Sequence, residues 1–186
     1  MLRVRDPSDH EAWGIFASIY RRAIFRAARC RGLQAADAED ITQEVLSRLS
    51  TRSWQFTPQS DGPRFRTWLA RVTDNAITDH HRKQRRHLET LSVSHAVVTA
   101  GEVVHDCFEM EYRREVFQWA ARIVRNEFSA AAWQSFWMTA VENRSVEEAA
   151  AALGRTVGSV YTSRSRILRR LKRQVRCFDE TLEDVL

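Results

Sequence analysis

The sequence predicts an all-α protein, built from two small helical domains that are joined by a flexible linker. Apolar residues recur at helical spacing on both sides of residues 89–107, a segment of small and polar residues without a clear period. The part of the chain after this segment ends in two helices that are connected by a short turn, and Gly154 lies in that turn. We therefore expect domains at residues 1–88 and 108–176, the second a helix-turn-helix domain of four helices, and an acidic tail at residues 177–186.

Three amphipathic helices are expected in the first domain, over about residues 9–31, 35–49 and 64–87. Gly32 ends the first of them, and Pro58 and Pro63 lie in the loop between the second and the third. The residues expected on their buried faces include Trp13, Phe16, Ile24, Ala27, Ile41, Val45, Phe65, Trp68, Leu69, Val72 and Ile77. Each helix then has one polar face that is available to solvent or a partner.

The second domain is expected to hold helices over about residues 108–128, 129–141, 145–153 and 156–176. Ser145 and Glu148 have the spacing of a capping box, and Gly154 stands where a left-handed residue would end the short helix. Thr156 can cap the last helix. The apolar stripe expected on that helix is Val157, Val160, Ile167, Leu168 and Leu171.

These last two helices have the pattern of a helix-turn-helix, whose second helix enters the major groove of DNA. Eight Lys or Arg and no Asp or Glu lie between Arg155 and Arg176, which favours binding to phosphates. The alternative is a basic helical hairpin with a solvated face. Short polar side chains off the apolar stripe, at Ser159, Thr162 and Ser165, favour DNA, because a solvated face more often carries Glu and Lys.

Composition sets further limits. The net charge of +5 favours a polyanionic partner. No run of eighteen apolar residues and no signal peptide is evident, so we expect a cytoplasmic protein without membrane insertion. Residues 177–186 carry four acids and no base, and this tail is either a solvated end or folds back on the basic helix.

The sequence does not indicate an enzyme, a metal site or a cofactor. There is no phosphate loop, no H-E-x-x-H pair and no G-x-S-x-G motif. His80 and His81 are adjacent, so they point apart on a helix and cannot share a metal as an i, i+4 pair would. Cys30, Cys107 and Cys177 lack C-x-x-C spacing, and we expect buried or incidental thiols without disulfides.

Two polar faces in the first domain differ in charge. Residues 35–49 carry four acids against one Arg. The helix dipole favours acids in the first turn, but Glu44 lies beyond that turn, so the dipole does not explain it. The exposed face of residues 64–87 is basic and holds Asn75. A basic helix with aromatics and an amide is suited to single-stranded nucleic acid, since cations contact phosphates, rings stack on bases and the amide pairs with a base edge.

Three motifs in this order resemble those of an extracytoplasmic-function sigma factor, the small two-domain type in the sigma-70 family of RNA polymerase specificity subunits. They are D-A-E-D-I-T-Q-E-V-L-S-R-L, F-R-T-W-L-A-R-V-T-D-N-A-I-T-D-H-H-R-K, and S-V-E-E-A-A-A-A-L-G-R-T-V-G-S-V-Y-T-S-R-S-R-I. The first looks like the core-binding segment, the second like the promoter-melting helix and the third like the carboxy-terminal helix-turn-helix. Together the three cover most of residues 10–87 and 110–174.

The resemblance implies a non-catalytic transcription initiation factor without cofactors, and it implies three sets of contact residues. The set for the clamp helices of the largest core polymerase subunit is Asp37, Asp40, Gln43 and Glu44. The set for the minus-ten element, read partly as single strand, is Trp54, Phe56, Arg66, Arg71, Asn75, Arg82, Arg85 and Arg86. The set for the double-stranded minus-thirty-five element is Arg155, Ser159, Tyr161, Thr162, Ser165 and Arg166. The polymerase flap and an anti-sigma factor are further implied partners.

Two other classes remain as alternatives. One is a stand-alone repressor or activator with an amino-terminal sensor domain, which would have no use for the acidic D-x-x-Q-E face. The other is a recombinase or nuclease with a helix-turn-helix tail, which would need a metal-binding carboxylate set or a nucleophilic Ser; no convincing arrangement of either is evident.

Overall fold

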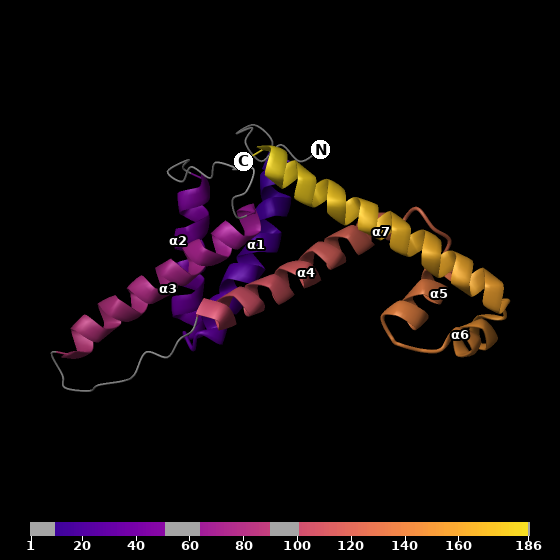
Figure 1. Ribbon diagram of the computed structural model, residues 1–186, viewed down its shortest axis with the longest axis horizontal. Helices are drawn as coiled ribbons and strands as arrows, with labels where there is room; N and C mark the ends of the chain where they lie inside the picture. The colour runs from indigo at the N-terminus through magenta and orange to yellow at the C-terminus, as the bar shows by residue number, and fades with distance from the viewer. Residues whose placement is uncertain (1–9, 51–63, 90–100, 186) are drawn as a thin grey trace. The chain divides into compact units, whose positions relative to one another are not determined.

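The computed structural model describes residues 10–50, 64–89 and 101–185, and every element in that part of the chain is an α-helix (Figure 1). The helices are α1 (His10–Cys30), α2 (Ala35–Ser50), α3 (Phe65–Glu89), α4 (Gly101–Arg125), α5 (Ala130–Ala140), α6 (Val146–Leu153) and α7 (Val157–Val185). The all-α prediction is therefore confirmed. None of the helices described here combines the length and the apolar composition that a bilayer-spanning helix requires.

The helices fall into two compact units, and the boundary between Glu115 and Val116 lies within α4. The linker predicted at residues 89–107 is wrong for residues 101–107, because α4 begins at Gly101 rather than near Phe108. Val104, Phe108 and Tyr112 recur at a spacing of four residues and are buried, so this stretch has the helical period that the sequence analysis missed. Residues 90–100 lie outside the described part.

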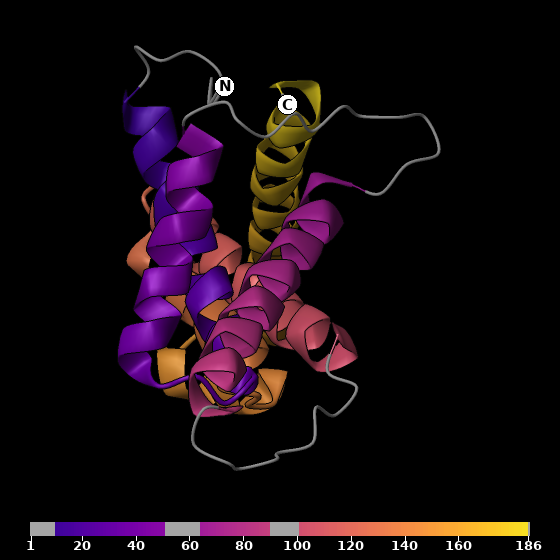
Figure 2. The same cartoon turned by 90° about the vertical axis from the view of Figure 1, so that its left-hand side faces the viewer.

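In the first unit, α1, α2 and α3 pack against one another, and α3 crosses the other two helices (Figures 1 and 2). Most of the apolar faces expected from the helical period are buried, including Phe16, Ile24 and Ile41. Trp13 and Trp68, which were also expected there, are only half-buried. Phe16 and Tyr20 of α1 meet Phe65 of α3 at ring-centroid distances of 5.9 and 5.7 Å. Aromatic burial of this kind contributes a large share of the stability of a small domain. The core thus fixes which faces of α2 and α3 remain outside.

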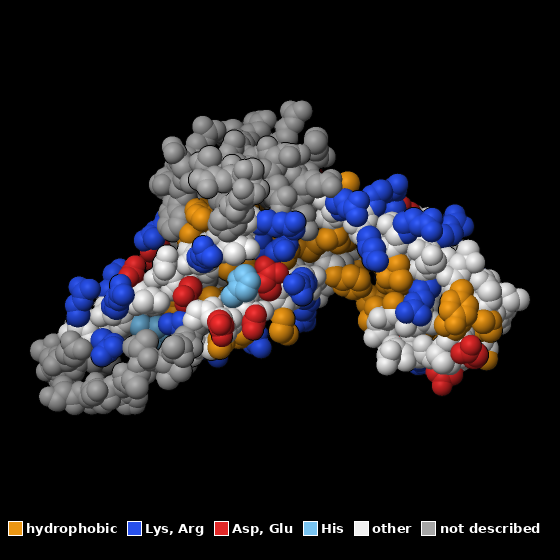
Figure 3. All heavy atoms as spheres, in the orientation of Figure 1, with side chains coloured by type: hydrophobic (Ala, Val, Ile, Leu, Met, Phe, Trp, Pro, Cys, Tyr) orange, Lys and Arg blue, Asp and Glu red, His pale blue; other side chains and the backbone are white. Residues whose placement is uncertain are grey.

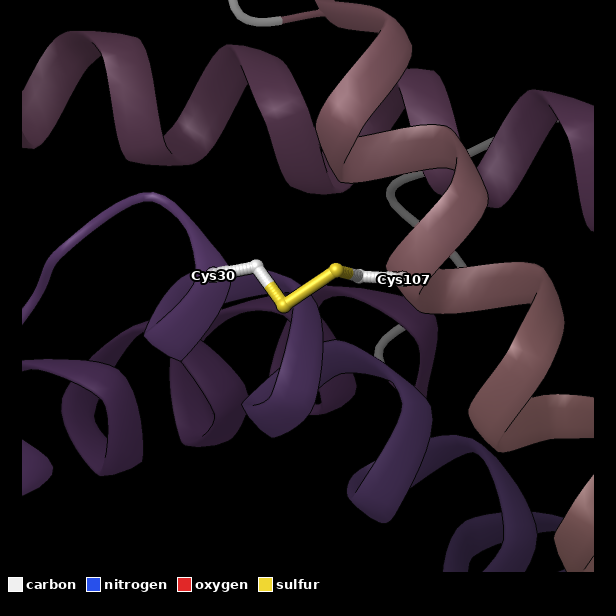
Figure 4. Close-up of a disulfide and its surroundings, with 2 residues drawn as sticks. All are labelled: Cys30 and Cys107. Carbon is white, nitrogen blue, oxygen red and sulfur yellow. A yellow bond between two sulfur atoms is a disulfide. The ribbon is translucent and has the colours of Figure 1, made fainter.

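Cys30 and Cys107 form a disulfide between the end of α1 and the first half of α4, with their Cα atoms 6.6 Å apart (Figure 4). The expectation of unpaired thiols is therefore wrong for these two residues. They are separated by 77 positions in sequence, and no spacing rule reveals such a pair. The packing of Phe108 and Tyr112 beside Tyr20 brings the two cysteines together.

The second unit has two adjoining apolar clusters. One gathers α4, α5 and α7 around Val124, Phe136 and Ile167. The other gathers α5, α6 and α7 around Ala149 and Val160. The predicted stripe of α7 is therefore mostly confirmed, but Val157 is 40% exposed, because it lies in the first turn, beyond the edge of the cluster.

α7 continues to Val185, so the acidic residues near the end of the chain extend the same helix through residue 185. One of the two expectations for the tail, that it folds back on the basic helix, is therefore wrong. Cys177 lies exposed on this helix and takes no part in the disulfide.

Candidate nucleic-acid interface

The acidic face predicted on the second helix lies on the outer side of α2. Ala38, Ile41 and Val45 face the core, which turns the intervening polar positions outward. Asp40 and Gln43 are exposed there, whereas Asp37 and Glu44 are half-buried. None of the predicted carboxylates is enclosed in the core, so this surface remains available to a partner.

Nearby cations partly neutralise the charge on α2. Glu44 pairs with Arg48 on the next turn, and Glu39 pairs with Arg21 of α1. Gln43 donates a hydrogen bond from Nε2 to the same Glu39 carboxylate at 3.3 Å. Ion pairs between solvent-exposed side chains contribute only about 0–1 kcal/mol each, so a partner cation can exchange into them at small cost.

α2 and α3 meet at a histidine pair. Nε2 of His80 lies 3.7 Å from Oδ1 of Asp37 and, in the described part of the chain, is buried without a hydrogen-bond partner. Desolvation lowers the pKa of the neighbouring His81, and the charges of Arg31 and His80 lower it further. A hydrogen bond with the Arg31 backbone and the charge of Asp37 act in the opposite direction. The two imidazole rings stand nearly perpendicular, at 75°.

The basic face predicted on the third helix lies along α3. Leu69, Val72 and Ile77 are buried, which leaves a polar face for the other side of the helix. The predicted residues that are exposed on it are Arg71, Asn75, Arg82, Arg85 and Arg86. Lys and Arg side chains gather over α3 and over α7 on the face shown in Figure 3. Cations on successive turns of one helix can follow a phosphate backbone.

Arg66 differs from these arginines because α4 already holds its guanidinium. Its Nε donates a 2.6 Å hydrogen bond to Oε1 of Glu109, and its Cζ lies 4.9 Å from the centroid of the Tyr112 ring. The sequence analysis grouped Arg66 with the phosphate contacts, since nothing in the sequence places Glu109 beside it. Trp54 and Phe56, the two aromatics predicted to capture a base, lie outside the described residues.

The local geometry of the α6–α7 pair agrees with the sequence. The Ser145 hydroxyl accepts from the Glu148 backbone, and the Glu148 carboxylate accepts from the Ser145 backbone. Gly154 ends α6 in the left-handed region with a φ of 60°. Thr156 then accepts at Oγ1 from the backbone of Ser159 at 3.2 Å. The capping box, the left-handed glycine and the second cap are all confirmed.

The outer face of α7 presents short polar side chains beside cations. Tyr161, Thr162, Ser165 and Arg166 are exposed, and Ser159 is half-buried. Ser159 donates its hydroxyl to the Thr156 carbonyl at 2.8 Å, and Thr162 donates to the Gly158 carbonyl at 2.9 Å. Since these donors are used within the helix, the hydroxyl oxygens retain lone pairs that can accept from a base edge.

Arg155, which the sequence predicts as a DNA contact, connects the turn between α6 and α7 to α5 in the second unit. Its Nη1 donates to the carbonyl of Ala131 at 3.1 Å and to the hydroxyl of Ser135 at 2.9 Å, both on α5. Arg170 is also engaged, through hydrogen bonds of 2.6 and 2.5 Å to the two carboxylate oxygens of Glu127. Two of the eight cations in this segment therefore stabilise the unit.

Three cations on the adjoining side of α7 were counted in its basic stretch but were not included in the set for the minus-thirty-five element. Arg164, Arg169 and Lys172 line a shallow hollow together with Tyr161 and Ser165. The i, i+4 relations from Tyr161 to Ser165 to Arg169 place these residues on neighbouring turns, and this period could have identified Arg169 from the sequence. The basic surface of α7 consequently extends beyond the residues of the predicted contact set.

Two comparisons with known proteins bear on these surfaces. Residues 16–87, which include α2 and α3, match the protein family described as Sigma-70 region 2. The chain is also similar to ECF RNA polymerase sigma factor BldN of Streptomyces coelicolor, with 27% identity over 169 residues. That match covers 88% of this chain and 60% of the relative, so the chain spans less than two thirds of the length of the relative.

Proposed function

We propose that this chain is a transcription initiation factor of the extracytoplasmic-function group in the sigma-70 family, which binds core RNA polymerase and directs it to specific promoters. One observation carries the proposal. The residues that match Sigma-70 region 2 include both the outward acidic face of α2 and the exposed basic face of α3. A protein with these two faces can contact a basic partner and a nucleic acid at the same time.

The acidic face of α2 is proposed to bind the clamp helices of the largest polymerase subunit, through Asp37, Asp40, Gln43 and Glu44. The position of these residues around the buried stripe of α2 supports this role, because none of the four is buried in the core. The pairs that Glu39 and Glu44 make with arginines are replaceable by cations of the partner. For the second unit we propose a contact with the polymerase flap, and an anti-sigma factor is a further partner implied by the family.

The exposed face of α3 is proposed to bind the minus-ten element as it opens. Asn75 would read an unstacked base of the non-template strand, while Arg71, Arg82, Arg85 and Arg86 contact phosphates. Exposure of these side chains on successive turns supports this arrangement. Unpairing a base costs a few kcal/mol, which phosphate contacts and stacking would offset. The same role is proposed for Trp54 and Phe56, and for Arg66 once it is released from Glu109.

The α6–α7 pair is proposed to bind the minus-thirty-five element in the major groove. Ser159, Tyr161, Thr162, Ser165 and Arg166 would face the bases, with Arg169 and Lys172 beside them on phosphates. The rigid turn at Gly154 and the caps at both helices support a fixed approach angle of α7. Arg155 would act indirectly, by attaching the start of α7 to α5.

Run-off transcription with purified core polymerase on a genomic fragment library tests this function. We expect transcripts that depend on the chain, and Asn75→Ala should reduce open-complex formation while duplex binding by the second unit persists. Gln84→Ala, which removes another exposed amide from α3, is the matched control. Specific duplex binding without any polymerase-dependent transcript would favour a stand-alone regulator instead. Cleavage of DNA without polymerase would favour a nuclease or recombinase.

A further inference from the structure

We propose that the Cys30–Cys107 disulfide is a redox latch on promoter binding. In the oxidised protein the disulfide holds the first half of α4 on the first unit. There the Glu109 carboxylate accepts the hydrogen bond from Arg66 that a phosphate of the promoter would otherwise accept. In the reduced protein this segment can leave and Arg66 becomes available. The inference rests on the function proposed above, because it concerns the regulation of the same surface.

The first half of α4 is seated on α1 and α3 by contacts that all lie within the first unit. Val104, Phe108 and Tyr112 are each at most 2% exposed. The Tyr112 ring centroid lies 5.2 Å from that of Tyr20, and the Phe108 centroid lies 6.2 Å from it. This segment is therefore packed into the unit as firmly as a core helix.

Ion pairs between carboxylates of α4 and arginines surround the contact of the first half of α4 with α1 and α3. Glu109 accepts from Arg66 at 2.6 Å and has Arg113 at 3.6 Å. One turn and a half further on, Glu115 is 7% exposed and accepts from Arg22 of α1 at 3.2 Å. Because one buried and one half-buried carboxylate face cations from other helices, α4 binds this surface by charge as well as by apolar contact.

Glu109 takes the place that a phosphate oxygen would take. A carboxylate and a phosphate both bind arginine through charged, short hydrogen bonds, so they compete for the same guanidinium. Glu109 has a side-chain exposure of 13% and Arg66 one of 23%, which leaves little room for a second anion. The contact of Arg66 with the Tyr112 ring closes another side of the cation. Phosphate binding by Arg66 thus requires that the Glu109 carboxylate be removed from the guanidinium, by movement of α4 or by substitution.

The disulfide is placed to control that movement. Cys107 lies two residues before Glu109 on α4, and Cys30 lies at the end of α1 (Figure 4). While the bond is intact, the segment around Glu109 cannot separate from α1. When the bond is reduced, only non-covalent contacts hold the first half of α4 on α1 and α3. A ligand that binds better to the state in which this segment has left can then shift the equilibrium toward that state. Both cysteines are half-buried, so a small thiol can approach them.

The chemistry is thiol–disulfide exchange with a low-molecular-weight disulfide. Each turn of oxidation consumes the Cys30 and Cys107 thiols and one such disulfide, and it yields the protein disulfide and two small thiols, which take up the two protons. Reduction is the reverse reaction. The disulfide of the protein forms as that of the small molecule breaks, so the electrons balance.

The first arm of the test measures the latch itself. The full chain carrying Cys177→Ser, which removes the exposed third cysteine, is prepared with oxidised glutathione or with dithiothreitol, and thiol alkylation with mass spectrometry determines its redox state. Hydrogen exchange should be faster in residues 101–115 of the reduced protein than of the oxidised one. The double variant Cys30→Ser with Cys107→Ser should behave as the reduced protein under both conditions. Equal exchange in the two states would overturn the latch.

The second arm measures promoter opening with core polymerase. We expect about tenfold slower open-complex formation by the oxidised protein than by the reduced protein. Glu109→Gln should restore much of the rate of the oxidised form, because an amide competes poorly with phosphate for a guanidinium. Glu111→Gln on the same helix, whose carboxylate lies near Arg114, is the matched control and should restore nothing.

The two arms separate the latch from the proposed function. Equal opening rates in the two redox states, or equal rescue by both glutamine variants, would overturn the inference while the function stands. If the protein opens no promoter in either state, the proposed function fails and the promoter-binding part of the inference fails with it. The exchange arm still decides in that case whether the disulfide controls α4.

Discussion

Arg155 donates a 2.9 Å hydrogen bond to the hydroxyl of Ser135 and another, at 3.1 Å, to the carbonyl of Ala131. The basic residue within the turn of the α6–α7 pair is thus a strut that connects this turn to α5. Its position in the sequence resembles that of a DNA contact, but its geometry assigns it to the stability of the unit. This distinction leads to opposite expectations for two arginines only eleven positions apart.

Arg155→Ala should lower the free energy of unfolding by about 1–3 kcal/mol, because it removes charged hydrogen bonds to α5. Urea unfolding followed by far-UV circular dichroism measures the change. Arg166→Ala, at an exposed position on α7, is the control and should stay within about 0.5 kcal/mol of the parent. If both variants unfold like the parent, the strut has no energetic role.

Arg166→Ala should instead cost about 1–3 kcal/mol of affinity for the cognate minus-thirty-five duplex, if its guanidinium contacts a guanine edge. The loss should be concentrated at one base position when a panel of single-base variants is titrated at constant salt. Arg176→Ala, near the end of the basic part of α7, provides the comparison for a cation remote from the turn. A loss of the same size on every duplex would make Arg166 a phosphate contact.

The triple variant with Asp40→Ala, Gln43→Ala and Glu44→Ala should lose binding to core RNA polymerase. The substituted side chains lie outside the α2 core, so the thermal midpoint should change little. Pull-down of purified core polymerase at physiological salt is the readout. Glu11→Ala, an exposed acid in the first turn of α1, controls for the change in charge. Retention of polymerase by the triple variant would refute the role of α2.

His81 should make the protein less stable in acid. Desolvation and the charges of Arg31 and His80 lower its pKa in the folded state below 6.5, so the unfolded chain takes up the proton first as the pH falls. The free energy of unfolding should therefore decrease as the pH is lowered through 6.5, and the decrease should end below the pKa of the folded state. Urea unfolding over this range measures the slope, which His81→Gln should reduce. An identical slope in the variant would contradict the assignment.

Much of the fold follows from short-range signals in the sequence. The helical period correctly places Phe16, Ile41 and Leu69 in the core, and the caps at Ser145 and Thr156 are where residue type and spacing put them. These features depend on residues within one or two turns of each other, and physical rules for helices act over that distance.

The features that sequence reasoning missed depend on contacts between distant segments. The Cys30–Cys107 bond and the Arg66–Glu109 pair both arise because residues 101–115 pack on the first unit, whereas the early start of α4 did have a local signal in its helical period. No local rule indicates this packing. The sequence therefore identified the charged faces correctly, but it could not tell which arginines were already engaged.

Photo-crosslinking from α3 tests the central claim most directly. Thr78→p-benzoylphenylalanine places the probe one turn from Asn75, and the full chain is irradiated with promoter DNA in the presence or absence of core polymerase. The account predicts crosslinks to the non-template strand of the minus-ten element only when polymerase is present. No crosslink with polymerase, or equal crosslinks to closed duplex without it, would contradict the claim that this chain joins the enzyme to an opening promoter.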